Sequence, residues 1–458
     1  MRTLTRFVTG GLAALIGVLL GAVPARAGSP DIATATSTPI KHFIFLMQGD
    51  RTFDNYFGTY PGADGIPDST CQALVLNRPQ SGCIKPFALH GTTPPLLEPG
   101  KSVINAQLNG GKLDGFVAAY AAQGQDGTSA MGYYDQRDLP YYWNVAQRYV
   151  LFDRFFASVP YGYRTNRAYW VAGGAQPGGG DKVSATGYGD QLTIFDRLQA
   201  AGVSWKFYVQ DYQPKETFRA KTATDQASQT VRVPLLNYAR FVDDPTLNSH
   251  IVDLDQYYRD LADGTLPAVA YVASSGSSER SARSIKAGQT LIHSMITSLM
   301  VSRSWSSSAL MWSYDGSGGW FDHVTPPTGM GLRVPAILVS PYAKHGRVDH
   351  TQLDYTSALN FIEQNWGVAP LTARDTAANN LTSAFDFAAR PRPAEIVPIA
   401  QQEEQPPLVK VAIIYWFYGA AAVLGILLLA FALRRSANGA RRALPPVPGH
   451  SNEEVLVS

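Results

Sequence analysis

The sequence predicts an α/β fold built on a mostly parallel sheet flanked by helices. Short apolar runs that end in turn residues alternate with longer stretches of helical periodicity, which is the pattern of repeated β–α–β units. The chain has 458 residues, 45% of them apolar, which is enough for a large core. The net charge is only +2 and no basic stripe interleaves with aromatic residues, so nucleic acid is not an expected partner.

Apolar runs of strand length and stretches of helical period give the expected elements. The expected strands are 41–48, 204–210, 268–274, 309–315 and 334–340, and the expected helices are 141–156, 193–201, 287–302 and 355–366. In open α/β sheets, ligands bind beyond the carboxyl ends of the strands. Gly49, Asp50 and Asp315 are therefore the first candidates for a site.

Both ends of the chain carry targeting signals. Residues 1–27 begin with Arg2 and Arg6, continue with an apolar run and finish with a small-x-small ending, which predicts a secretory signal peptide, with a retained membrane anchor as the alternative. Residues 411–433 are uncharged, long enough to cross a bilayer and closely followed by four arginines. They predict a transmembrane helix that leaves the tail 434–458 in the cytoplasm, with a buried core helix as the alternative.

The sequence between these signals is expected to lie outside the cell membrane. Residues 28–388 predict a single domain, and residues 389–407, rich in Pro, Gln and Glu, predict a stalk. The only two cysteines, Cys71 and Cys83, lie close together in a loop-like stretch. Because disulfides persist in an exterior compartment, we expect these two to be paired.

Two of the strand ends carry polar residues suited to a functional site. They are FLMQGDRTFDNYFG (45–58) and WSYDGSGGWFDHVTPP (312–327). These stretches resemble a phosphoesterase family that includes bacterial phospholipases C and a class of acid phosphatases, with a fold similar to that of alkaline phosphatase. The resemblance continues, in the family's motif order, through 131–159, 166–170 and 333–367. It implies hydrolysis of phosphate esters by a divalent metal and a hydroxyl nucleophile.

The chain departs from the family pattern at its functional positions. Gly49 and Asp50 stand where the family has a Glu–Asn pair, and Asp315 and Gly316 stand where it has Asp–Glu. The position of the Ser or Thr nucleophile holds Tyr163.

Two histidine positions of the family are also changed. Arg280, after Glu279, stands at the histidine position of the Glu-His-Pro or Asp-His-Pro motif of relatives. Tyr355 stands at the histidine position of the Asp-His-Thr-Ser motif that relatives often have.

The resemblance implies a role for each matching residue. Asp50 and Asp315 would be the ligands of one weakly held divalent metal ion, Tyr163 or Thr165 the nucleophile, and His323 a general acid or ligand. The matching substrate-binding residues are Asn166, Arg167, Arg280 and Asp322. Structural alternatives are turn or helix capping for the aspartates, a backbone hydrogen bond for the histidine, and an ordinary ion pair for Arg167.

Loss of functional residues while the surrounding family motifs stay recognisable is typical of an enzyme homologue that has lost its activity. The first hypothesis is thus an impaired or inactive phosphoesterase outside the membrane, acting as a binder or an envelope partner. Arginines would make the pocket net positive and suit a phosphorylated lipid headgroup or an envelope phosphodiester. These arginines are Arg164, Arg167, Arg280 and Arg283. The alternatives are an active phosphoesterase with a rearranged metal site and a structural envelope protein.

Overall fold

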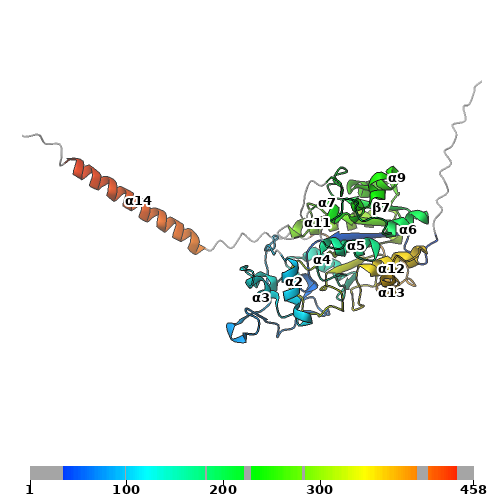
Figure 1. Ribbon diagram of the computed structural model, residues 1–458, viewed down its shortest axis with the longest axis horizontal. Coiled ribbons are helices and arrows are strands. Elements are labelled where there is room, and N and C mark those ends of the chain that lie inside the picture. The colour runs from blue at the N-terminus through cyan, green and yellow to red at the C-terminus, as the bar shows by residue number, and fades with distance from the viewer. Residues whose placement is uncertain are drawn as a thin grey trace, which may run out of the picture.

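The protein is an α/β structure with an eight-stranded central sheet flanked by helices (Figure 1). The computed structural model describes residues 35–97, 99–180, 183–220, 228–280, 284–399 and 411–440. The strands lie in the order β12 (Arg347–Asp349), β6 (Val150–Phe152), β11 (Ala336–Val339), β10 (Ser308–Tyr314), β1 (His42–Gln48), β9 (Val269–Ala273), β7 (Trp205–Val209) and β8 (Ile251–Asp253). β11 pairs antiparallel with β10 and β6, and the other pairs are parallel. The predicted fold class is confirmed.

The remaining elements of the described chain are helices and short minor strands. The helices are α1 (Phe53–Phe57), α2 (Lys101–Leu108), α3 (Phe116–Ala121), α4 (Pro140–Ala146), α5 (Tyr163–Ala172), α6 (Ile194–Ala200), α7 (Gln229–Arg232), α8 (Ala239–Asp243), α9 (Pro245–Asn248), α10 (Asp255–Asp263), α11 (Ile285–Val301), α12 (Tyr355–Trp366), α13 (Ala373–Ala377) and α14 (Val411–Ala440). The minor strands are β2 (Gln72–Ala73), β3 (Cys83–Ile84), β4 (Phe87–Ala88) and β5 (Gly132–Tyr133).

The predicted strands are present as β1, β7, β9, β10 and β11, and three predicted helices are present as α6, α11 and α12. The helix predicted at 141–156 is wrong in its second half, because α4 ends at Ala146 and β6 follows at Val150–Phe152. β6 lies between β12 and β11, and all three of its side chains are buried. Burial in the sheet overrides the helical spacing there.

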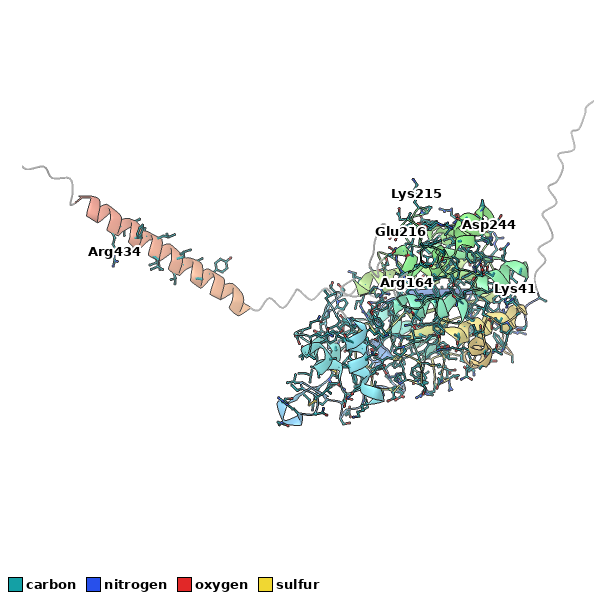
Figure 2. The ribbon with its side chains drawn as sticks, in the orientation of Figure 1. Lys41, Arg164, Lys215, Glu216, Asp244 and Arg434 are labelled. Carbon is teal, nitrogen blue, oxygen red and sulfur yellow. A yellow bond between two sulfur atoms is a disulfide. The ribbon has the colours of Figure 1, made fainter. Side chains whose placement is uncertain are left out.

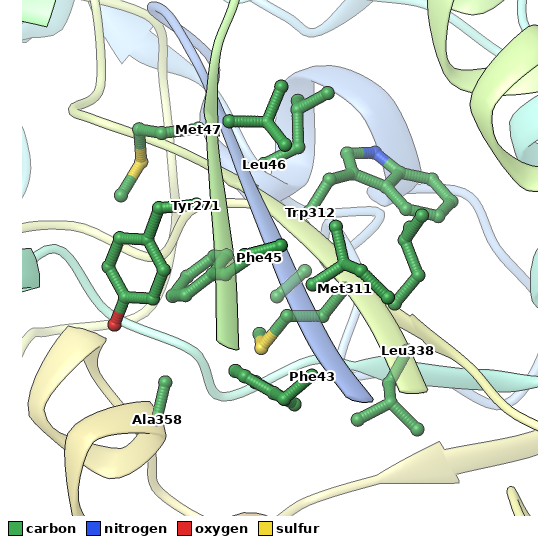
Figure 3. Close-up of a cluster of buried hydrophobic side chains, with 14 of the residues drawn as sticks. Phe43, Phe45, Leu46, Met47, Tyr271, Met311, Trp312, Leu338 and Ala358 are labelled. Carbon is green, nitrogen blue, oxygen red and sulfur yellow. The ribbon is translucent and has the colours of Figure 1, made fainter. Parts of the chain in front are cut away.

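The core explains how the strands and α5 hold their positions. The strands at the centre of the sheet are buried on both faces, which fits their continuous apolar sequences. Figure 3 shows part of this packing, where Phe45 of β1 lies beside Tyr271 of β9, and Leu46 of β1 lies beside Trp312 of β10 on the other face of the sheet. Trp170 of α5 stacks on Tyr271, with ring centroids 4.6 Å apart. This contact fixes α5 against the sheet.

A second apolar cluster supports the segment that follows β10. Trp320, Phe321 and Leu332 pack there against Phe116 of α3. The disulfide between Cys71 and Cys83 closes a nearby loop, which confirms the predicted pairing.

The ends of the chain leave several predictions open. The side chains described on α14, from 418 to 434, are exposed, and Figure 2 shows Arg434 among them. In the part of the chain that the structure describes, no helix is found that is long and apolar enough to cross a bilayer, so the transmembrane helix predicted at 411–433 is not confirmed. The predicted signal peptide, 400–407 of the stalk and 441–458 of the tail lie outside the described residues.

Candidate functional site

Three neighbouring parallel strands bring the candidate residues to one edge of the sheet. Asp50 follows β1, Asp315 follows β10, and Arg280 lies in the loop after β9. Asp50 has a positive φ of 66°, which turns the chain sharply after β1. Asp50 and Asp315, both candidates from the sequence, therefore lie at the carboxyl ends of adjacent strands.

The carboxylates of Asp50 and Asp315 are joined by the guanidinium of Arg280. Arg280 Nη1 lies 3.1 Å from Asp50 Oδ1, and Arg280 Nη2 donates to Asp315 Oδ2. Arg167 Nε donates to the same Asp315 oxygen at 2.7 Å. All four side chains are buried. Two positive and two negative charges thus balance one another within the cluster.

Tyr163 covers this cluster instead of acting as an exposed nucleophile. The guanidinium carbon of Arg280 lies 3.8 Å from the centre of the Tyr163 ring, within the range of a cation–π contact. The Tyr163 hydroxyl forms a hydrogen bond with Asp50. Burial, together with the charge of Asp50, raises the pKa of Tyr163 well above its ordinary value. The phenol is therefore protonated at neutral pH, which disfavours nucleophilic attack.

The two glycines of the changed motifs lie directly against these side chains. A Cβ atom added at Gly49 would lie 3.0 Å from Arg280 Cβ and 3.1 Å from Arg280 Nε. A Cβ at Gly316 would lie 3.2 Å from Cε1 of Tyr163. The space that glutamate side chains would need at these positions is occupied by the arginine and the tyrosine.

This arrangement does not fit a metal ion held by Asp50 and Asp315. One oxygen of each carboxylate already accepts from Arg280, and a cation between them would meet the guanidinium. Asp315 Oδ1 is buried and has no hydrogen-bond partner among the described residues. Burial raises the pKa of Asp50, although Arg280 opposes the rise. For Arg280, the charges of Asp315 and Asp50 outweigh the effect of burial and raise its pKa.

Most of the other residues predicted around the nucleophile make structural contacts. Asn166 bonds the backbone of Val159, with Oδ1 accepting from the amide at 2.9 Å. Thr165 Oγ1 accepts a hydrogen bond from Gln176 at 3.1 Å. Arg167, besides its ion pair, donates to the carbonyl of Arg232 at 2.9 Å.

The expected net positive pocket is not what the described residues form. Arg164, labelled in Figure 2, donates to the carbonyl of Thr230 and to Asn237 Oδ1 at 3.1 and 3.3 Å. Arg280 and Arg167 are balanced by the two aspartates. Arg283 lies outside the described residues.

A second charged cluster contains His323 and Asp322. Atoms of Asp54, Asp322 and His323 lie within 4.8 Å of one another and form a group that could hold a metal ion. Arg333 already binds both carboxylates, at 2.9 Å each, and His323 Nδ1 lies 2.7 Å from Asp54 Oδ2. His323 Nε2 lies 3.2 Å from Asp64 Oδ1. Each member therefore has a partner within the protein.

The ionisation of this second cluster follows from its burial and its charges. Burial opposes the protonation of His323, but the hydrogen bond and charge of Asp54 outweigh it and raise the pKa of the imidazole. Burial also raises the pKa of Asp322 to about 6, against the opposing charge of Arg333. His323 is therefore placed in an ion-pair network with carboxylates, and not in the backbone hydrogen bond that was the structural alternative.

A buried network that sequence reasoning missed fixes the residue before Arg280. Glu279 is fully buried and accepts hydrogen bonds from the hydroxyls of Tyr56, Tyr142 and Tyr314. A Cβ at Gly288 would come within 2.0 Å of Glu279 Oε1, so the glycine leaves room for this carboxyl. Glu279 stands in a polar, serine-rich run, and no local pattern indicates that three distant tyrosines enclose it.

Tyr355, at the changed histidine position, also has a structural contact. It is fully buried, and its hydroxyl donates to the carbonyl of Tyr314, the last residue of β10. The position therefore supports the strand end that carries Asp315.

Comparison with known proteins identifies the same relatives that the motifs suggest. The model of a family described as Phosphoesterase family matches residues 40–369. Phospholipase C B of Mycobacterium tuberculosis (strain ATCC 25618 / H37Rv) is 29% identical over 422 residues, covering 78% of this chain and 80% of the relative. Hemolytic phospholipase C of Pseudomonas aeruginosa is 26% identical over 449 residues, covering 82% of this chain and 61% of the relative.

A plant protein and a solved structure are also similar. Non-specific phospholipase C1 of Arabidopsis thaliana is 26% identical over 404 residues, covering 77% of this chain and 72% of the relative. A crystal structure of a protein in the alkaline phosphatase superfamily from Vibrio parahaemolyticus matches with a TM-score of 0.39 and 12% identity, covering 81% of this chain and 73% of that one.

Proposed function

The chain belongs to the phosphoesterase family. We propose that the changes at the sheet edge have impaired or abolished its ability to hydrolyse phosphate esters. The family and the phospholipase C relatives support phosphate ester hydrolysis as the ancestral reaction. The changes in this chain affect the two parts that such a reaction needs, a cation and a nucleophile.

One observation carries this proposal: the guanidinium of Arg280 lies between Asp50 and Asp315. A metal ion there would polarise a phosphoryl oxygen and assist deprotonation of the nucleophile. A guanidinium supplies positive charge, but its donors are bonded to the two carboxylates instead of facing a substrate. Among the described residues, Tyr163 supplies the hydroxyl that bonds Asp50, and its raised pKa keeps it protonated.

In this proposal the domain acts outside the cell membrane as a binding or assembly partner. The apolar run 411–433 and the four arginines after it support a single-pass anchor with the tail in the cytoplasm. The names of the phospholipase C relatives support a phosphorylated lipid as the class of ligand, and an envelope phosphodiester shares its chemistry. Because Arg167 and Arg280 are internally paired, ligand binding does not depend on free arginines at the sheet edge.

The direct test is turnover of generic phosphomonoester and phosphodiester substrates with Mg²⁺, Mn²⁺, Ca²⁺ and Zn²⁺. We expect the purified protein to show no hydrolysis above that of its Asp315→Ala variant, while a phospholipase C relative assayed in parallel is active. Metal-dependent turnover that Asp315→Ala abolishes would overturn the proposal.

An active phosphoesterase with a rearranged metal site is the second candidate. The group of Asp54, Asp322 and His323 favours it, because carboxylates and an imidazole can hold a divalent ion. In the same assay this candidate predicts metal-dependent turnover that survives Asp315→Ala and is lost in His323→Ala.

A further inference from the structure

We propose that Arg280 is a resident substitute for a divalent cation, so that the sheet-edge site needs no metal, and that removing its side chain exposes a latent cation site. This inference deepens the proposed function and rests on it, because both start from the Arg280 ion pairs. It concerns binding and stability, however, and not turnover.

The charge of the cluster shows why a cation is needed there. Asp50 and Asp315 are 4% and 0% exposed, and they reach the same point from adjacent strands. Two buried carboxylates this close repel each other unless positive charge lies between them. Of these two carboxylates, Arg167 pairs with that of Asp315 in the described contacts, whereas Arg280 pairs with both. Without Arg280, Asp50 would lose its ion-pair partner, and only the more indirect charge of Arg51 would still act on it among the described residues.

The surroundings hold Arg280 in this bridging position. Gly49 has no side chain and leaves space beside Cβ and Nε of Arg280, and the ring of Tyr163 covers the guanidinium. The preceding residue, Glu279, is fixed by the three tyrosine hydroxyls. The loop after β9 is therefore anchored at Glu279, and the next side chain reaches the carboxylates.

The atoms left around the gap define the class of ion that the latent site would take. They are the carboxylate oxygens of Asp50 and Asp315, including the unpartnered Asp315 Oδ1, and the hydroxyl of Tyr163. No sulfur or imidazole contacts Arg280 in the described contacts. Oxygen ligands select hard divalent cations such as Mg²⁺, Mn²⁺ and Ca²⁺.

The test compares the thermal stability of four full-length proteins with EDTA and with about 10 mM MnCl₂. They are the wild type, Arg280→Ala, Arg280→Lys and the double variant Arg280→Ala/Asp315→Asn. We expect Arg280→Ala to melt below the wild type in EDTA and to gain about 2 °C or more with Mn²⁺. The wild type and the double variant should be indifferent to Mn²⁺, because one has its own cation and the other has lost a carboxylate. Arg280→Lys is the matched control, which keeps a positive charge and should not respond.

Two outcomes would overturn the inference. One is a folded Arg280→Ala that does not respond to Mn²⁺, or responds no more than the double variant. The other is a wild type that contains stoichiometric divalent metal and loses stability in EDTA, a measurement that does not depend on any variant folding. A wild type that hydrolyses phosphate esters yet is indifferent to EDTA would contradict the proposed function and leave this inference standing.

Discussion

Gly49 and Gly316 show at the scale of single residues why a changed motif can persist. Each glycine lies against a side chain that is itself a departure from the family pattern, Arg280 in one case and Tyr163 in the other. Restoring a side chain at one position alone would crowd its neighbour. The substitutions are therefore coupled through space, although they lie far apart in the sequence.

This coupling predicts a specific double-mutant cycle. Gly316→Ala should destabilise the protein by about 1–3 kcal/mol, because the new methyl group would press on the Tyr163 ring. In a Tyr163→Ser background the same change should have a much smaller effect, since the ring is gone. Equilibrium urea unfolding would measure both differences. Gly276→Ala is the matched control, because its Cβ would meet no described atom closer than 3.5 Å. An equal effect of Gly316→Ala in both backgrounds would contradict the coupling.

The identities of the candidate residues could be predicted from the sequence, but their contacts could not. Asp50 and Asp315 follow recognisable strands, so their approach was predictable. The direction of the Arg280 side chain depends on the burial of Glu279 among three tyrosines from distant segments. The predicted positive pocket failed for the same reason, because a residue count does not show which charges pair.

At the scale of elements, strands with long apolar runs were predicted well and short mixed segments were not. β1, β9 and β10 are buried on both faces, and their continuous apolar sequences predict this burial. β6 has only three residues and follows α4 after a short turn, so helical spacing concealed it. Its pairing with β11 and β12 is a tertiary property.

α14 carries the prediction that belongs to this scale. The exposed apolar side chains on it include Val423, Leu424, Ile426, Leu429 and Phe431. Apolar side chains in such number favour a hydrocarbon environment. We expect the full chain to fractionate with membranes and to resist alkaline carbonate, and a chain that ends at residue 400 to be released. Recovery of the full chain in the soluble fraction would contradict the proposed anchor.

At the scale of the whole molecule, our proposal is that the fold is retained while its reaction centre is closed. The ends of β10, β1 and β9 lie side by side in the sheet. Ion pairs between residues of the chain occupy this edge. A second arginine, Arg333, likewise pairs with both Asp54 and Asp322. In both clusters, an arginine of the chain supplies positive charge to paired carboxylates.

The most direct test of this account is a crystal structure of the protein grown with MnCl₂, with anomalous scattering used to locate manganese. The account predicts no manganese between Asp50 and Asp315, and the Arg280 guanidinium in contact with both carboxylates. A manganese peak between these carboxylates, with Arg280 turned away, would contradict it.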